Sequence, residues 1–77
     1  MLSRRTYTIV VEPEPTGGYW VFVPALPGCF TRGDTVEECG ENAAEAIAMH
    51  IAGLEADGEP VPEEHCQAQL LTVTVAA

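Results

Sequence analysis

The segment 28–38 constrains the fold more than any other part of the chain, because it marks a junction between a short strand and a helix. Gly33 is predicted to adopt a positive φ, which costs a residue without a Cβ atom no steric penalty. Asp34 or Thr35 can then accept a hydrogen bond from the first free N–H groups of the helix, and each has a glutamate three residues on, the spacing of a capping box. We interpret the residues of this junction as structural, with turn and cap roles: Gly28, Gly33, Asp34, Thr35 and Glu38.

Two β-type segments precede the junction and are predicted to form a hairpin. Residues 7–12 are β-friendly and end on an acid, and residues 19–23 are β-branched or aromatic throughout. The segment 13–18 between them is rich in Pro and Gly, which is typical of a turn. Gly28 then turns the chain into a short third strand at residues 29–32.

A helix is predicted over residues 36–56. Its apolar residues recur at steps of three and four and form one stripe: Val36, Cys39, Ala43, Ile47, Ile51 and Leu54. Gly40 lies beside this stripe, which predicts a close approach of the helix to the sheet there. Asp57 and Gly58 are typical of a helix C-terminus, and two prolines shortly beyond them prevent its continuation.

Residues 70–75 are predicted as a last strand, so the element order is strand, strand, strand, helix, strand. Three antiparallel strands and a crossover helix to a fourth fit a mixed four-stranded sheet with one helix on one face. The predicted fold class is therefore α+β, a β-β-β-α-β two-layer sandwich in a single domain over residues 1–77. A chain of this length buries only about 60–65% of the surface that it exposes when unfolded, so self-association would add to its stability.

The second predicted strand is apolar on both faces, which one helix cannot cover. Tyr19, Val21 and Val23 point one way, while Trp20 and Phe22 point the other. An exposed patch with large aromatics marks a protein interface; the alternative is that Pro-rich loops fold over it. We predict a homo-oligomer, most simply a dimer, that uses this face or the adjacent sheet edge, with an interface of Trp20, Phe22 and Val10.

The charge balance is strongly acidic. Three arginines stand against twelve acidic residues, which gives a net charge of −9 with no lysine. Because nucleic-acid binding depends on basic residues that neutralise phosphates, the chain is predicted to bind neither nucleic acid nor anionic lipid directly. Such a surface attracts a basic protein and speeds its encounter; alternatively, the acidity only keeps the protein in solution.

Neither a membrane segment nor a cofactor site is predicted. No apolar run approaches the roughly 20 residues that span a bilayer, and the N-terminus does not read as a signal peptide. Three cysteines cannot all pair internally, which is consistent with a reduced, cytoplasmic protein. Cys66 beside His65 could ligate a metal together with Cys29 or His50, but the spacing is not that of a metal motif, so we expect no metal and no cofactor.

Most of the chain, from about residue 7 to residue 54, resembles the HicB family of antitoxins. The resemblance is carried by P-x-L-P-G-C at 24–29, G-D-T-x-E-E at 33–38 and N-A-x-E-A-I at 42–47. It implies a partial RNase H-like fold. It also implies that the protein neutralises a HicA-type toxin, a small basic ribonuclease that cleaves mRNA, by masking its RNA-facing surface. The acids expected to face such a toxin are Glu12, Glu14, Glu41 and Glu45.

Two expectations separate this chain from that pattern. Many HicB proteins carry a C-terminal DNA-binding module, and none is expected here because the chain stops at Ala77, directly after the predicted last strand. The alternative function is an orphan HicB-like domain that self-assembles or binds a ligand without a toxin. Catalysis of the RNase H type would need converging carboxylates, and the predicted last strand has none, so we expect no enzyme.

Overall fold

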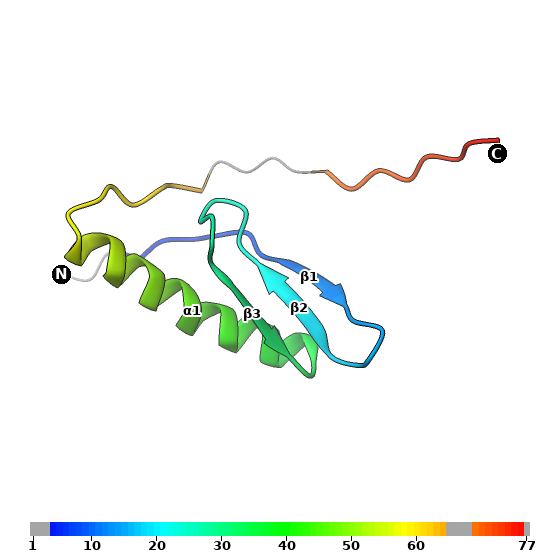
Figure 1. The fold of residues 1–77 in the computed structure, drawn as a ribbon, viewed down its shortest axis with the longest axis horizontal. Coiled ribbons are helices and arrows are strands. Elements are labelled where there is room, and N and C mark those ends of the chain that lie inside the picture. Colours follow the sequence, from blue (N-terminus) through cyan, green and yellow to red (C-terminus); the bar gives the residue numbers. More distant parts are fainter. Residues whose placement is uncertain (1–3, 65–68, 77) are drawn as a thin grey trace.

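The computed structural model describes residues 4–64 and 69–76. Within the first of these ranges, a three-stranded antiparallel sheet carries one long helix packed on one face (Figure 1). The strands are β1 (Val10–Pro13), β2 (Tyr19–Phe22) and β3 (Phe30–Gly33), and the helix is α1 (Val36–Ala56). The hairpin, the third strand, the bounds of the helix and the α+β class are confirmed. β1 begins three residues later than predicted.

The order of the sheet is β1-β2-β3, with β2 in the centre. Val10 and Phe30 both pair with Phe22, and Val21 pairs with Val11 on one side and Thr31 on the other. Because paired residues in antiparallel strands point to the same face, this register divides the strands into two faces. We call the face against α1 the inner face and the opposite one the outer face.

The core lies between the inner face and α1, and it consists of two adjoining clusters. Val21, Cys39 and Ala43 are buried in the first cluster, where β2 meets the first half of α1. The second cluster is formed by residues after β2 that the loop to β3 brings under the helix: Val23, Leu26 and Cys29. Gly28 in this loop has φ +85, so its turn requires glycine. Val36, predicted as part of the buried stripe, is instead 55% exposed at the start of α1.

The close approach of helix to sheet is at Gly33 and not at Gly40. A Cβ atom on Gly33 would lie 2.8 Å from both the backbone N and the Sγ of Cys39, whereas a Cβ atom on Gly40 would have no neighbour within 4 Å. Gly33 also lacks the positive φ that the sequence predicted. The residue is therefore required for lack of a side chain and not for its backbone conformation.

Both ends of α1 are capped by the predicted residues. Thr35 is the N-cap, and its side-chain oxygen accepts a hydrogen bond of 3.1 Å from the backbone N–H of Glu38, so Thr35 is used in place of the alternative Asp34. At the other end the backbone N–H of Asp57 donates to the carbonyl of Gly53, and Gly58 has φ +70. These caps fix the length of the helix.

A connector, residues 59–64, leads from α1 back along the N-terminal segment. The hydroxyl of Tyr7 donates a hydrogen bond of 2.5 Å to the carbonyl of Pro62, and the backbone N–H of Thr8 donates one of 3.2 Å to Oε1 of Glu64. The connector is thus held beside the segment that enters β1.

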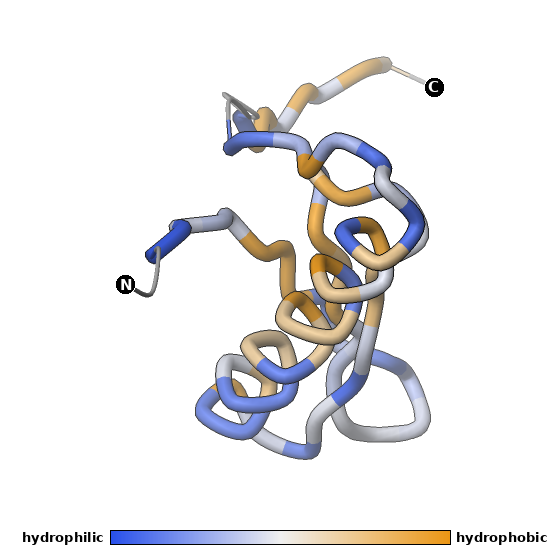
Figure 2. The backbone as a smooth tube through the Cα atoms, turned by 90° about the vertical axis from the view of Figure 1, so that its left-hand side faces the viewer, coloured by the Kyte–Doolittle hydropathy of each residue, from blue (hydrophilic) through white to orange (hydrophobic). Residues whose placement is uncertain are grey.

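The predicted fourth strand is wrong for this structure. Residues 69–76, which we call the C-terminal arm, have no strand pairing and run away from the sheet (Figure 1). Their apolar side chains are exposed: Leu70, Leu71, Val73 and Val75. Figure 2 shows hydrophobic residues both in the body of the molecule beside α1 and along the arm. A β-type sequence forms a strand only against a partner edge, and within the described residues the arm has none. The described sheet therefore has three strands and not four, and the RNase H-like fold is not confirmed.

Candidate protein-binding surface

The outer face of the sheet carries the aromatic residues that α1 does not cover. The register places Val10, Phe22 and Phe30 in one row across the three strands. Trp20 stacks on Phe30 with ring centroids 5.1 Å apart and an interplanar angle of 29°. Phe30 is 57% exposed. The three residues predicted for the interface therefore lie together on this face.

Phe30 is the member of this surface that the sequence reasoning missed. Cys29 is buried and Phe30 exposed, as expected for consecutive residues at the start of a strand. The alternation was readable in the sequence, but β3 is only four residues long. The pairing of Phe30 with Phe22 needed the register, which the sequence did not supply.

Charged side chains flank the aromatic row. Glu12 and Arg32 pair with Trp20 from its two sides, so both belong to the outer face. Arg32 also makes a salt bridge of 2.5 Å with Glu14, and the backbone carbonyl of Arg32 accepts a hydrogen bond of 2.7 Å from the side-chain amide of Asn42. An exposed pair of this kind adds at most about 1 kcal/mol to stability, but it occupies the carboxylate of Glu14.

The four predicted toxin-facing acids do not form one cluster. Glu12 and Glu14 lie at the sheet, whereas Glu41 and Glu45 are exposed on α1, which covers the opposite face. The same separation keeps Glu12 away from Glu41 and Glu45, so these carboxylates do not converge on one site. The structure therefore offers two acidic regions and not one site.

An acidic row along α1 is the stronger of these two regions. Glu37, Glu41 and Glu45 follow one another at steps of four and are exposed. The helix contains five glutamates and neither lysine nor arginine. Like charges four residues apart destabilise a helix by about 0.2–0.5 kcal/mol per pair, so helix stability does not explain the row. Glu37 lies in the first turn of the helix and belongs to the row by its spacing.

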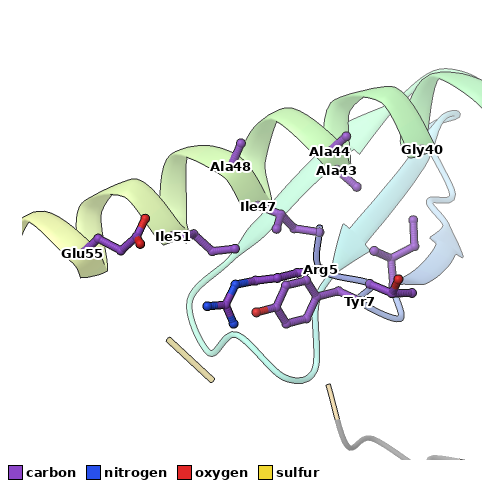
Figure 3. A pocket seen from close by; sticks show the side chains of 11 residues that line it. Arg5, Tyr7, Gly40, Ala43, Ala44, Ile47, Ala48, Ile51 and Glu55 are labelled. Carbon is purple, nitrogen blue, oxygen red and sulfur yellow. The ribbon is translucent and has the colours of Figure 1, made fainter. Parts of the chain in front are cut away.

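A groove lies beside the second half of α1 on the inner side of the sheet. It has a volume of about 880 Å³, and Figure 3 shows Arg5 and Tyr7 of the N-terminal segment across from Ile47 and Ile51 of the helix. Its walls are mainly apolar side chains, with Arg5 and Glu55 as the charged residues. Sequence reasoning did not predict this groove.

The two thiols that the structure describes, Cys29 and Cys39, are buried. Burial raises the pKa of Cys29, and burial together with the negative charges of Glu38, Asp34 and Glu37 raises the pKa of Cys39. Among residues 4–64 and 69–76, no three His, Cys, Asp or Glu side chains gather as metal ligands. His65 and Cys66, which the sequence offered as possible metal ligands, lie outside the described residues.

The described part of the chain contains no helix that is both long and apolar enough to cross a membrane.

Known proteins resemble this chain over most of its length. It is 44% identical over 69 residues to a UPF0150 protein of Synechocystis sp., covering 90% of this chain and 87% of that protein. A UPF0150 protein of Thermoplasma acidophilum is 41% identical over 61 residues, with 79% and 88% covered. The protein named Antitoxin HicB 1 of Photorhabdus laumondii is 34% identical over 62 residues, which cover 80% of this chain but 40% of that antitoxin.

The family model described as the HicB-like antitoxin of bacterial toxin–antitoxin systems matches residues 7–73. This match takes in every strand, the helix and the junction at residues 33–38 that the sequence singled out. The chain therefore belongs to the HicB-like antitoxin family.

Proposed function

We propose that the protein is an antitoxin that binds and neutralises a small basic toxin of the HicA type, which cleaves mRNA in the cytoplasm. The family supports the antitoxin role. The observation that carries the choice of partner is the acidic row of α1, defined by Glu37, Glu41 and Glu45, on a helix without a lysine or arginine. A basic protein surface is the complement of such a row.

Electrostatics gives this encounter its speed and orientation. The chain has a net charge of −9, and one of its three arginines, Arg32, is already paired with Glu14. Complementary charges raise association rates and fix the register of docking more than they raise affinity. Covering the basic surface of a ribonuclease would also exclude its RNA, since RNA needs those same basic groups.

Charge reversal at two positions of the row tests the proposal. The double variant Glu41→Lys, Glu45→Lys is expected to slow association with the cognate toxin about tenfold at low salt. A matched control, Glu59→Lys with Glu63→Lys, makes the same charge change at two exposed residues of the connector and should slow association less.

Association of the wild type should slow as salt rises, because the Debye length falls to about 3 Å at 1 M. If the cognate basic protein fails to bind at low salt, the antitoxin proposal is wrong. If both double variants slow association equally, the row on α1 is not the docking surface.

A second proposal rests on the outer face, which supports the alternative of a self-assembling domain. We propose that two copies associate through Trp20, Phe22 and Phe30, because aromatic residues at the centre of an interface contribute up to a few kcal/mol each. A stable homo-oligomer from a host without a small basic partner protein would favour this function over the antitoxin. The two are compatible, since the outer face and the row on α1 lie on opposite sides of the sheet.

A further inference from the structure

The free edge of β3 presents main-chain groups that β2 does not pair. β3 lies at one edge of the three-stranded sheet (Figure 1), and residues of an antiparallel strand bond to their neighbour strand only at every second position. The N–H of Val23 donates a hydrogen bond of 3.1 Å to the carbonyl of Cys29, so Cys29 and every second residue after it bond toward β2. The main-chain groups of Phe30 and Arg32 therefore point away from the sheet. We call this side of β3 the β3 edge.

Asn42 of α1 occupies one of these outward groups. Its side-chain amide donates a hydrogen bond of 2.7 Å to the carbonyl of Arg32, which agrees with a carbonyl that points away from β2. Within the described residues, the N–H and carbonyl of Phe30 and the N–H of Arg32 have no such partner. A row of unpaired main-chain groups is a template for a further strand, and Asn42 closes the template at its Arg32 end.

The side of α1 next to the β3 edge is acidic. Asn42 marks this side by its bond to β3. Glu38 lies four residues before Asn42 and Glu45 three residues after it, so both share this side of the helix. Arg32, the basic residue of β3, is already paired with Glu14. A strand added to the β3 edge therefore meets carboxylates on its helix side.

The same strand meets aromatic surface on its other side. Phe30 is 57% exposed and stacks on Trp20 of the outer face. Because the side chains of a strand alternate between two faces, one set of the added strand would contact Phe30 and the other set would lie beside Glu45. The β3 edge thus fits an extended segment in which basic and apolar residues alternate.

The opposite edge of the sheet lacks this charge pattern. The β1 side of the helix borders the groove, where Arg5 accompanies Glu55. The connector also bonds to Tyr7 and Thr8 in the segment that enters β1. A basic segment therefore finds its complement at the β3 edge.

We propose that an extended segment of the basic partner protein, with basic and apolar residues in alternation, adds to the β3 edge as a further strand. Main-chain hydrogen bonds to Phe30 and Arg32 supply affinity, while Glu38 and Glu45 select basic side chains. The identity of the partner rests on the proposed function. The mode of docking goes beyond it, because attraction to an acidic helix does not by itself require strand pairing.

Amide hydrogen exchange of ¹⁵N-labelled protein, free and bound to the small basic partner protein, tests the proposal. We expect binding to slow exchange of the N–H groups of Phe30 and Arg32 by about tenfold or more. The N–H of Thr31 bonds toward β2 in both states and serves as the internal control.

The outcomes of this experiment separate the two proposals. A complex in which the N–H groups of Phe30 and Arg32 exchange as fast as in the free protein would overturn strand addition and leave the antitoxin role standing. Failure to form a complex at low salt would overturn both. Protection of the two groups already in the free protein would assign the edge to a second copy and would also overturn strand addition by the partner.

Two substitutions of Phe30 separate main-chain pairing from contact with the ring. Phe30→Ala and Phe30→Pro both remove the aromatic side chain, but only proline removes the N–H. Proline is tolerated at the first residue of an edge strand, and helical circular dichroism reports whether both variants are folded. We expect Phe30→Pro to bind the partner about fivefold more weakly than Phe30→Ala. Equal affinities of two folded variants would overturn the proposal.

Two charge reversals on opposite sides of α1 test the selection of a basic segment. Glu45→Lys changes the side next to the β3 edge, and Glu55→Lys makes the same change on the groove side. We expect Glu45→Lys to weaken the complex about tenfold and Glu55→Lys to weaken it much less. Equal losses in the two variants would overturn the proposal.

Discussion

The two faces of the sheet are built from alternate residues of the same strands, yet they differ in what covers them. On the inner face Val21 is completely buried against Cys39 and Ala43 of α1. On the outer face Phe22, the next residue along β2, shares a row with Phe30, which is more than half exposed. Both faces are apolar, so hydrophobicity alone does not distinguish a core from an interface.

The difference shows that chain connectivity decides which face of the sheet the helix covers. One helix follows β3 closely enough to be capped by Thr35, and it can cover only one face. The other apolar face is not covered by the helix, and we propose that another molecule covers it, because exposed aromatic patches of this kind are typical of sites of association. Inner-face substitutions should therefore change folding, and outer-face substitutions should change association.

The largest effect is expected where the inner face admits no additional atom. Gly33→Ala should lower the free energy of unfolding by about 2–3 kcal/mol, because the new Cβ would lie 2.8 Å from the backbone N of Cys39, which cannot move independently of the helix. Urea denaturation followed by circular dichroism measures this change.

The same substitution at Gly40 serves as the control. Its Cβ would meet nothing within 4 Å, so Gly40→Ala should raise the free energy of unfolding by about 0.5–1 kcal/mol through helix propensity. If Gly33→Ala were as stable as the wild type, the contact between β3 and α1 would not be as tight as described.

A smaller effect is expected at the cap that aligns α1 with the inner face. Thr35→Ala removes the oxygen that accepts from the N–H of Glu38 and should destabilise the protein by about 1 kcal/mol. Thr35→Ser keeps this oxygen and should retain most of the stability in thermal unfolding. Equal losses in the two variants would indicate that the methyl group, and not the cap, is important.

The smallest effect concerns the pH dependence of the inner face. The raised pKa of Cys39 means that the folded state holds the thiol proton more tightly than the unfolded state. The resulting stabilisation is complete below the unfolded pKa of about 8.5 and is lost as the pH rises through the folded value. The free energy of unfolding should fall above about pH 8.5, and Cys39→Ala should reduce this slope, with Cys29 responsible for the remainder. An unchanged slope in Cys39→Ala would contradict burial of this thiol.

Local signals predicted the parts of the fold that depend on near neighbours. The helix over residues 36–56 and its caps follow from spacing within a few residues, and these were correct. The role of Gly33 was predicted wrongly, because its close approach to Cys39 depends on packing between β3 and α1. A glycine in a sequence does not reveal whether it is needed for a positive φ or for its lack of a side chain. Gly40 was mistaken for the same reason.

Prediction failed where the outcome depends on a partner. The arm around Val73 has the composition of a strand, but a strand forms only against another edge, and the sequence does not say in which molecule that edge lies. The candidate surface was predicted in part: Trp20 and Phe22 follow from alternation, whereas Phe30 required the register of β3. Glu12 and Glu41, both predicted to face a toxin, lie on opposite sides of the sheet, and their contact with a toxin stays a prediction.

The division between the two faces is tested most directly by a pair of neighbouring substitutions on β2, each measured for both unfolding and self-association. Val21→Ala should lower the free energy of unfolding by about 2 kcal/mol through the cavity that it leaves, with self-association in sedimentation equilibrium unchanged. Phe22→Ser should weaken self-association at least tenfold and leave the unfolding of the isolated chain nearly unchanged. A wild type that is monomeric at high micromolar concentration, or a Phe22→Ser chain that unfolds while Val21→Ala remains stable, would contradict the assignment of the faces.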